Sequence, residues 1–206
     1  MSDTRLYLIT PSSFNLDEFS IILKDALDGG DVASVQLRMK ESSDEDIIKA
    51  AQVLMPICHA KDVAFIINDS VDIAVKTGAD GVHIGQEDMP IKEAREIIGA
   101  DKIIGVTCKD SKHLAMTAGE QGADYVAFGT FYPTTTKITT TVASPKILNW
   151  WQEVFEIPCV AIGGINTENA AEMAKAGADF VAICSGVWDY PEGPAAAVKK
   201  INEEIS

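Results

Sequence analysis

The chain has 206 residues, of which 47% are hydrophobic and 23% are charged, and its formal net charge is −14. This length and composition predict one globular domain, residues 1–206, with a sizeable core. The acidic balance argues against a nucleic-acid partner, because a phosphate backbone binds to a basic face. It leaves open a small phosphorylated ligand, since a few local cations can dominate one pocket.

The sequence also limits where the protein is expected to act. No apolar run approaches the roughly 18 residues that cross a bilayer, so we expect no membrane contact. The first residues lack a basic region and a cleavage site, which predicts no signal peptide and a cytoplasmic protein. The four cysteines, Cys58, Cys108, Cys159 and Cys184, are widely spaced. We interpret them as free thiols, mostly buried, in a reducing compartment.

One pattern recurs eight times: a short apolar run, a polar loop and an amphipathic helical stretch. The expected strands cover residues 6–10, 34–38, 64–68, 81–84, 103–107, 125–128, 159–162 and 180–184. The expected helices lie near 16–27, 44–61, 71–77, 91–98, 112–121, 146–155, 169–176 and 195–205. This alternation predicts parallel strands with helical crossovers. Eight units predict an α/β fold, a closed (β/α)8 TIM barrel, with an open doubly wound sheet as the alternative.

Three expected helix ends share the sequence Gly-Ala-Asp, at residues 78–80, 122–124 and 177–179. Glycine suits the left-handed conformation that often ends a helix. We interpret these turns as structural, at the bottom of the barrel. The residues that follow each strand therefore lie at the top, where the active sites of such barrels are built.

Cations follow the second expected strand, in the sequence Gln36-Leu37-Arg38-Met39-Lys40. Alternation along a strand would place Gln36, Arg38 and Lys40 on one face. Buried cations are costly without partners, so this row predicts a clamp for a phosphate or diphosphate. An ion-paired strand end is the alternative.

Acids follow the third and fourth expected strands, at Asn68-Asp69 and at Asp88. Two carboxylates on one rim suit a hard divalent cation with oxygen ligands. Each acid also has a structural alternative: Asp69 as a helix N-cap and Asp88 as a turn residue. We expect His83 to be packed and hydrogen-bonded rather than a ligand. The Thr107 hydroxyl, at the fifth tip, either donates to an anion or belongs to an ordinary strand residue.

The longest interval between elements, residues 129–144, is rich in hydroxyl groups. A long loop in a compact barrel is usually functional, often as a lid. Thr134, Thr135, Thr136 and Lys137 could together hold phosphate oxygens, although a flexible surface loop is the alternative for the later threonines.

Small residues end the last two strands, at Gly163-Gly164 and at Cys184-Ser185-Gly186. Glycines there free backbone N–H groups for an anion, and many barrels hold a phosphate in this way. Two anion sites and a metal pair together predict diphosphate chemistry.

Seven segments follow one another in the order seen in the thiamine-phosphate synthase (thiamine-phosphate pyrophosphorylase) family: QLRMK, IINDSVDIAV, ADGVHIGQEDMP, IIGVT, ADYVAFGTFYPTTTK, AIGGI and CSG. The chain resembles that family over nearly its whole length. The resemblance implies a (β/α)8 transferase. It would join 4-amino-2-methyl-5-(diphosphooxymethyl)pyrimidine to 4-methyl-5-(2-phosphooxyethyl)thiazole, or to its carboxythiazole tautomer, and release diphosphate.

The resemblance also implies roles for individual residues. The implied Mg2+ ligands, for one ion per active site, are Asp69 and Asp88. The implied catalytic residues are Arg38, Lys40, Thr107 and Lys137. The implied substrate-binding residues are Gln36, Arg38, Lys40, Asn68, Thr107, Thr134, Thr136, Lys137, Gly164, Cys184 and Ser185. The tip Thr107-Cys108-Lys109 departs from the family, where a serine is common at the first position.

Two other functions fit the same fold. A thiazole tautomerase-like isomerase resembles the synthase but tends to lose the metal acids and the clamp, which are present here. A catalytically silent, phosphate-sensing barrel is the second alternative. The expected partners are small phosphorylated substrates, and the sequence is compatible with a homo-oligomer.

Overall fold

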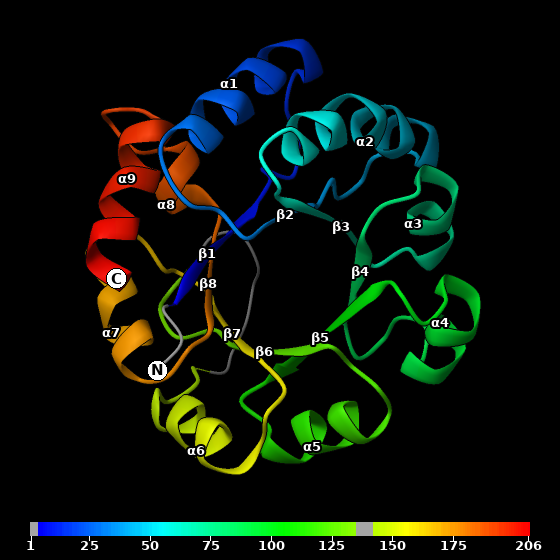
Figure 1. Cartoon of the computed structure of the whole chain (residues 1–206), viewed down its shortest axis with the longest axis vertical. Helices are drawn as coiled ribbons and strands as arrows, with labels where there is room; N and C mark the ends of the chain where they lie inside the picture. The colour runs from blue at the N-terminus through cyan, green and yellow to red at the C-terminus, as the bar shows by residue number, and fades with distance from the viewer. Residues whose placement is uncertain (1–3, 135–141) are drawn as a thin grey trace.

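The structure is a computed structural model that describes residues 4–134 and 142–206. Eight parallel strands follow one another around a closed barrel, and β8 pairs with β1. Figure 1 shows the strands as an inner ring and the helices as an outer ring, with the chain running once around. The predicted (β/α)8 barrel is confirmed, and the open sheet is excluded because the edge strands pair with each other.

All the predicted elements are present, and their ends agree with the prediction to within two residues. The strands are β1 (Arg5–Ile9), β2 (Ser34–Leu37), β3 (Ala64–Asn68), β4 (Gly81–Ile84), β5 (Ile103–Lys109), β6 (Tyr125–Gly129), β7 (Cys159–Ile162) and β8 (Phe180–Ile183). The helices are α1 (Leu16–Asp28), α2 (Asp44–His59), α3 (Val71–Thr77), α4 (Ile91–Ile98), α5 (Lys112–Glu120), α6 (Lys146–Val154), α7 (Ala170–Lys175), α8 (Ser185–Trp188) and α9 (Pro194–Ile205). The sequence did not predict α8. None of the described helices is long and apolar enough to cross a membrane.

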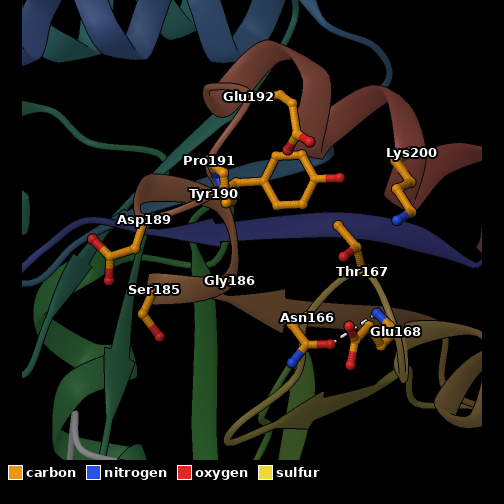
Figure 2. Close-up of a pocket in the computed structure, with 10 residues that line it drawn as sticks. All are labelled: Asn166, Thr167, Glu168, Ser185, Gly186, Asp189, Tyr190, Pro191, Glu192 and Lys200. Carbon is orange, nitrogen blue, oxygen red and sulfur yellow. Dashed lines mark hydrogen bonds between the residues drawn. The ribbon is translucent and has the colours of Figure 1, made fainter.

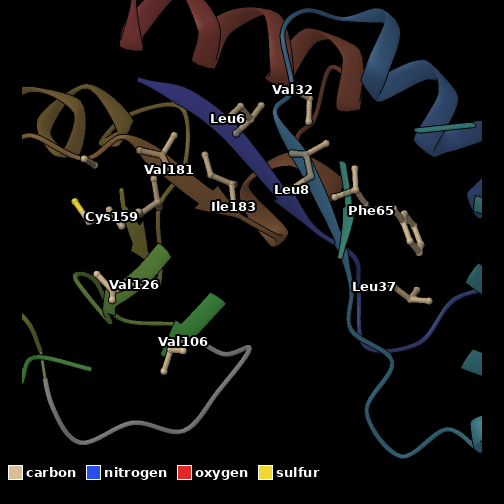
Figure 3. Close-up of a cluster of buried hydrophobic side chains, with 14 of the residues drawn as sticks. Leu6, Leu8, Val32, Leu37, Phe65, Val106, Val126, Cys159, Val181 and Ile183 are labelled. Atoms are coloured by element: carbon tan, nitrogen blue, oxygen red, sulfur yellow. The ribbon is translucent and has the colours of Figure 1, made fainter. Parts of the chain in front are cut away.

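Alternate side chains along the strands fill two separate cores. Leu6 and Leu8 of β1 belong to the cluster between the sheet and the helices (Figure 3). Tyr7 and Ile9 of the same strand belong to a second cluster inside the barrel, together with Tyr125. Because both faces of each strand are buried, the strands read in the sequence as continuous apolar runs.

Four helices begin at a residue whose side chain accepts a hydrogen bond from a backbone N–H three residues later. These N-caps are Asn15, Ser43, Ser70 and Ser111. Such caps satisfy N–H groups that the helix itself cannot pair. They fix the entry point of each helix, and with it the loop that leaves the preceding strand.

The Gly-Ala-Asp turns have the backbone conformation that their glycines predict. Gly78 has φ 74°, and Gly122 and Gly177 each have φ 93°. Residues with a side chain rarely adopt these angles. Each turn can therefore end its helix sharply and lead straight into the next strand.

The aspartate of each of these turns binds the preceding strand at one residue. Its carboxylate accepts from the backbone N–H of that residue, and its own N–H donates to the carbonyl. The pairs are Asp80 with Phe65, Asp124 with Ile104, and Asp179 with Cys159, with hydrogen bonds of 2.7–3.0 Å. We call these three contacts the aspartate clamps. They confirm a structural role at the bottom of the barrel, opposite the predicted site.

Candidate active site

Asp69 and Asp88 follow the neighbouring parallel strands β3 and β4, and their carboxyl groups lie close enough to interact electrostatically. Partial loss of water raises the pKa of Asp69, and the adjacent Asp88 raises it further. Arg38 and Lys40 lower it. The structure therefore brings both acids and both cations of the prediction to one rim.

The backbone around Asp69 shows that it does not cap the next helix. Ser70 is the N-cap of α3, so the N-cap alternative for Asp69 is wrong. Asp69 has φ 65°, and its N–H donates to the carbonyl of His83 at 2.7 Å. A left-handed aspartate is uncommon, and such residues cluster at functional sites. This conformation directs the carboxyl group toward Asp88 instead of along α3.

Asp88 does stabilise its turn, as the structural alternative proposed. Its Oδ2 atom accepts from the N–H of Gly85 at 2.7 Å. This hydrogen bond closes the loop after β4 and holds the carboxyl group at the rim. The turn role and the metal role are therefore compatible in one side chain.

The donor set at the rim fits Mg2+, which prefers oxygen ligands. Two adjacent carboxylates repel each other, and a divalent cation between them would remove that repulsion. Within residues 4–134 and 142–206, no three or more His, Cys, Asp or Glu side chains group into a metal site. The remaining ligands would therefore be water and substrate oxygens, which is usual for Mg2+.

The cation clamp is built differently from the predicted strand face. Because β2 ends at Leu37, the prediction that Arg38 lies in the strand is wrong, and Arg38 and Lys40 belong to the following loop. The N–H of Arg38 donates to the Thr10 hydroxyl at 2.9 Å, which ties this loop to the end of β1. Gln36, in contrast, lies inside the barrel and is only 3% exposed.

The fifth tip also differs from the prediction. β5 continues past Thr107 to Lys109, with a register shift between these two residues. Such a bulge re-aims the side chains beside it. The Thr107 hydroxyl lies 2.7 Å from Nε2 of His83, and the Thr107 carbonyl accepts from the Gln86 amide at 2.7 Å. The expectation that His83 is packed and hydrogen-bonded is confirmed.

Two tyrosines that the sequence did not single out lie beneath the rim. Gln36 Nε2 donates to the Tyr7 hydroxyl at 2.8 Å. The hydroxyls of Tyr7 and Tyr125 are 2.8 Å apart, and Tyr125 is 2.9 Å from Nδ1 of His83. Burial raises the pKa of Tyr7 to about 12 and that of Tyr125 well above its usual range. Gly105 in the middle of β5 is the place where the Tyr125 ring approaches the neighbouring strand, and a strand glycine often marks such a close approach.

The loop after β6 packs against the tip of β7. The N–H of Tyr132 donates to the carbonyl of Gly163 at 3.0 Å. A Cβ atom on Gly164, which has φ 67°, would lie 2.5 Å from the carbonyl oxygen of Pro133. Only glycine permits this approach, and it brings Thr134 close to the predicted phosphate site. Thr135, Thr136 and Lys137 lie outside the described residues.

The tip of β8 completes the same side of the rim. The strand ends at Ile183, so Cys184 lies just beyond it, and Ser185 begins α8. A Cβ atom on Gly186 would lie 2.7 Å from the carbonyl oxygen of Ile165. The two glycine-containing tips therefore pack against each other, as a shared phosphate site requires.

Figure 2 shows a pocket of about 380 Å3 next to this tip. It lies between the loop after β7 and the connection from α8 to α9, and Ser185 is its one residue from the predicted substrate-binding set. Three acids, Glu168, Asp189 and Glu192, line it, against one cation, Lys200. Their carboxylates would repel a phosphate, so the pocket adjoins the candidate site without extending it.

Comparison with known proteins gives consistent matches over the whole chain. The family model described as thiamine monophosphate synthase matches residues 6–187. The thiamine-phosphate synthase of Rhodospirillum centenum is 60% identical over 202 residues, which cover 98% of both chains. That of Hyphomonas neptunium is 50% identical over 204 residues, covering 97% of this chain and 92% of the relative.

Solved structures match as well. Thiamine phosphate pyrophosphorylase from Pyrococcus furiosus has a TM-score of 0.85 at 33% identity, covering 99% of this chain and 96% of the other. A 3-hexulose-6-phosphate synthase has a TM-score of 0.72 at 18% identity, covering 98% of this chain and 100% of the other. The second likeness indicates the fold alone.

Proposed function

The chain belongs to the thiamine monophosphate synthase family, and on that basis we propose that it is a thiamine-phosphate synthase. It would join 4-amino-2-methyl-5-(diphosphooxymethyl)pyrimidine to 4-methyl-5-(2-phosphooxyethyl)thiazole, or to its carboxythiazole tautomer. The products would be thiamine phosphate and diphosphate. The observation that carries this proposal is the contact between Asp69 and Asp88 within electrostatic reach of Arg38 and Lys40.

The rim would bind the diphosphate of the pyrimidine substrate. Mg2+ held by Asp69 and Asp88 would supply positive charge to the departing diphosphate. Arg38 and Lys40 add further positive charge, and the Thr107 hydroxyl can donate to a phosphate oxygen. We extend this role to Lys137 from the resemblance, and place the pyrimidine beside Gln36 and Asn68.

The reaction would proceed by a dissociative substitution. The bond between the pyrimidine methylene carbon and the diphosphate oxygen breaks, and its electron pair leaves with the diphosphate. The aminopyrimidine ring delocalises the positive charge left on the methylene carbon. The lone pair of the thiazole nitrogen then forms the new bond, so no general base is needed. The chain contributes position and charge stabilisation.

The thiazole phosphate would lie at the tips of β7 and β8. The packing of these tips on each other supports this placement, because it leaves Gly164 and Ser185 on the same side of the rim. Thr134, Thr136 and Cys184 join the same subsite by position. The reaction would take place in the cytoplasm, in agreement with the free cysteines.

The decisive experiment incubates the purified protein with both substrates and Mg2+ and follows thiamine phosphate by mass spectrometry. We expect product only when both substrates are present. A folded sample that makes no product would overturn the synthase assignment. Isomerisation of the thiazole phosphate alone would favour the tautomerase-like function.

The metal ligands are tested by replacing each acid with its amide. Asp69→Asn and Asp88→Asn each replace a negatively charged ligand of the ion with a neutral amide. The interaction that is lost is worth about 1.5–3 kcal/mol. The Mg2+ concentration for half-maximal activity should therefore rise by about 10–100-fold. Asp72→Asn, an exposed change on α3, is the control. Wild-type activity of either site variant at limiting Mg2+ would contradict its ligand role.

A further inference from the structure

A continuous line of hydrogen bonds crosses the barrel interior between two predicted substrate-binding residues. It runs from Gln36 through Tyr7, Tyr125 and His83 to Thr107, with donor–acceptor distances of 2.7–2.9 Å. Gln36 and Thr107 belong to β2 and β5, which are separated in the barrel by β3 and β4. The middle residues therefore connect side chains that no strand pairing links.

The orientation of the Gln36 amide, whose nitrogen faces Tyr7, sets one direction along this line. The Gln36 amide nitrogen can only donate, so the Tyr7 oxygen accepts from it. Tyr7 must then donate to Tyr125, and Tyr125 to Nδ1 of His83. The opposite order would leave the Tyr7 proton without an acceptor among the residues that the structure describes, which is costly.

This direction determines the state of both ends. If Nδ1 of His83 accepts, Nε2 carries the proton and donates to the Thr107 oxygen. The Thr107 proton is then oriented to donate to another acceptor. At the other end, the donation to Tyr7 fixes the Gln36 amide plane and turns its oxygen away from Tyr7. The Thr107 hydroxyl thus offers a donor to a bound substrate, and the Gln36 amide oxygen offers an acceptor.

We propose that Tyr7 and Tyr125 are positioning residues for the synthase reaction. They act through Gln36 and through His83 to hold the Thr107 hydroxyl as a donor to the leaving diphosphate. This inference rests on the proposed function, because it assigns a use to the two ends of the line.

The surroundings of the two tyrosines make demands that a purely hydrophobic side chain would not make. A Cβ atom on Gly105 would lie 1.9 Å from Cζ of Tyr125, so β5 gives up a side chain to admit this ring. Both tyrosines are buried, at 3% and 7% exposed. Buried hydroxyls must find partners, whereas phenylalanine would fill most of the same space without that requirement.

The first test observes His83 directly. Nitrogen NMR of 15N-histidine-labelled protein at neutral pH distinguishes the two neutral tautomers. We expect the wild type to show His83 with the proton on Nε2. Tyr7→Phe should keep this state, because Tyr125 can still donate, whereas Tyr125→Phe should add the form protonated on Nδ1. A wild-type His83 protonated on Nδ1, or on both nitrogens, would overturn the proposed direction.

The second test asks whether Tyr125 acts through Thr107. Tyr125→Phe should lower kcat/KM for the pyrimidine diphosphate by about tenfold, the equivalent of ~1.4 kcal/mol. Combined with Thr107→Val, it should cost little more than Thr107→Val alone, because the two residues share one contact. Thr107→Ser retains the hydroxyl and should restore sensitivity to Tyr125→Phe. Additive losses would show a merely structural role and overturn the proposal.

The two tests separate this inference from the proposed function. The tautomer of His83 is measured without substrate, so it can refute the hydrogen-bond direction in an active enzyme. A wild type with the expected tautomer but no thiamine phosphate formation would instead refute the function. Tyr190→Phe, which removes the hydroxyl of a half-buried tyrosine on the connection to α9, controls for the loss of a tyrosine hydroxyl.

Discussion

Burial makes most of the thiols of this protein unreactive at neutral pH. It raises the pKa of Cys58, Cys108 and Cys159 to about 12, with nearby Asp80 and Asp179 adding to the effect at Cys58 and Cys159. The thiolate is the reactive form of cysteine. These three side chains therefore act as small core residues.

Alkylation checks this consequence. At pH 8 we expect iodoacetamide to modify at most one thiol of the native protein, at Cys184, which is partly exposed and has its pKa raised to about 11 by burial. All four thiols should react after unfolding in urea. Intact-mass measurement gives the count, and two or more additions to the native protein would contradict the burial of the other three.

Single residues of the site differ in how far the sequence could predict them. Asp69 and Asp88 could be placed, because all parallel strands of a barrel end at the same rim and both acids follow such a strand. Tyr7 and Tyr125 could not, because a tyrosine inside an apolar strand reads as a core residue. Their hydroxyls meet across the barrel from positions 118 residues apart, and only closure of the barrel reveals that contact.

At the level of elements, each aspartate clamp joins the end of a helix to the start of the strand that directly precedes that helix. Asp179 has two further contacts, since its carboxylate accepts from Gln152 of α6 at 2.6 Å and its carbonyl accepts from the N–H of Arg5 at 2.9 Å. This clamp therefore connects β7, α6 and β1. The sequence indicated the turn through its glycine, but the partner of the aspartate depends on register, which periodicity does not give.

Asp179→Ala tests the value of a clamp. The variant leaves the buried N–H of Cys159 without its carboxylate acceptor, and we expect a loss of about 1–3 kcal/mol in the free energy of unfolding. The melting temperature should fall by about 2–12 °C. Glu203→Gln, an exposed change on α9, should stay within about 0.5 kcal/mol of the wild type. Equal melting temperatures for the two variants would show that the clamp is dispensable.

Two element-level features escaped prediction for physical reasons. The helix α8 has a single turn, which is too short to show a periodic pattern of hydrophobic residues in the sequence. The bulge in β5 arises where two strands change register after Thr107, and a one-residue shift leaves no mark on composition. Both features lie at the rim, where the chain departs from regular geometry to present functional groups.

At the scale of the whole molecule, closure of the barrel pairs the first strand, β1, with the last strand, β8. Arg5 opens β1, and its guanidinium donates to both oxygens of Asp31 at 2.7 Å. That hydrogen bonding lowers the pKa of Asp31, partial burial opposes it, and the Arg5 charge lowers it further. A group with a lowered pKa in the folded state stabilises that state above its unfolded pKa. The stabilisation disappears as pH falls through the folded value.

Asp31→Asn makes this contribution measurable. Urea unfolding at several pH values should show the wild type more stable than the variant by at most about 1 kcal/mol near pH 6, because the pair is exposed. The difference should shrink once the pH falls below about 4, the ordinary aspartate range, and vanish below the lowered pKa. A difference that stays constant down to pH 2 would contradict the pairing.

The two ends of the barrel place different demands on mutation. At the lower end, the aspartate clamps depend on a carboxylate and a backbone turn and touch no predicted ligand. At the upper end, the acids, cations and glycine tips lie in the loops that follow the strands. The upper loops could therefore be redesigned for a new phosphorylated substrate while the aspartate clamps at the lower end stay unchanged. Random libraries should divide accordingly, with loss of soluble protein mapping to one rim and loss of turnover to the other.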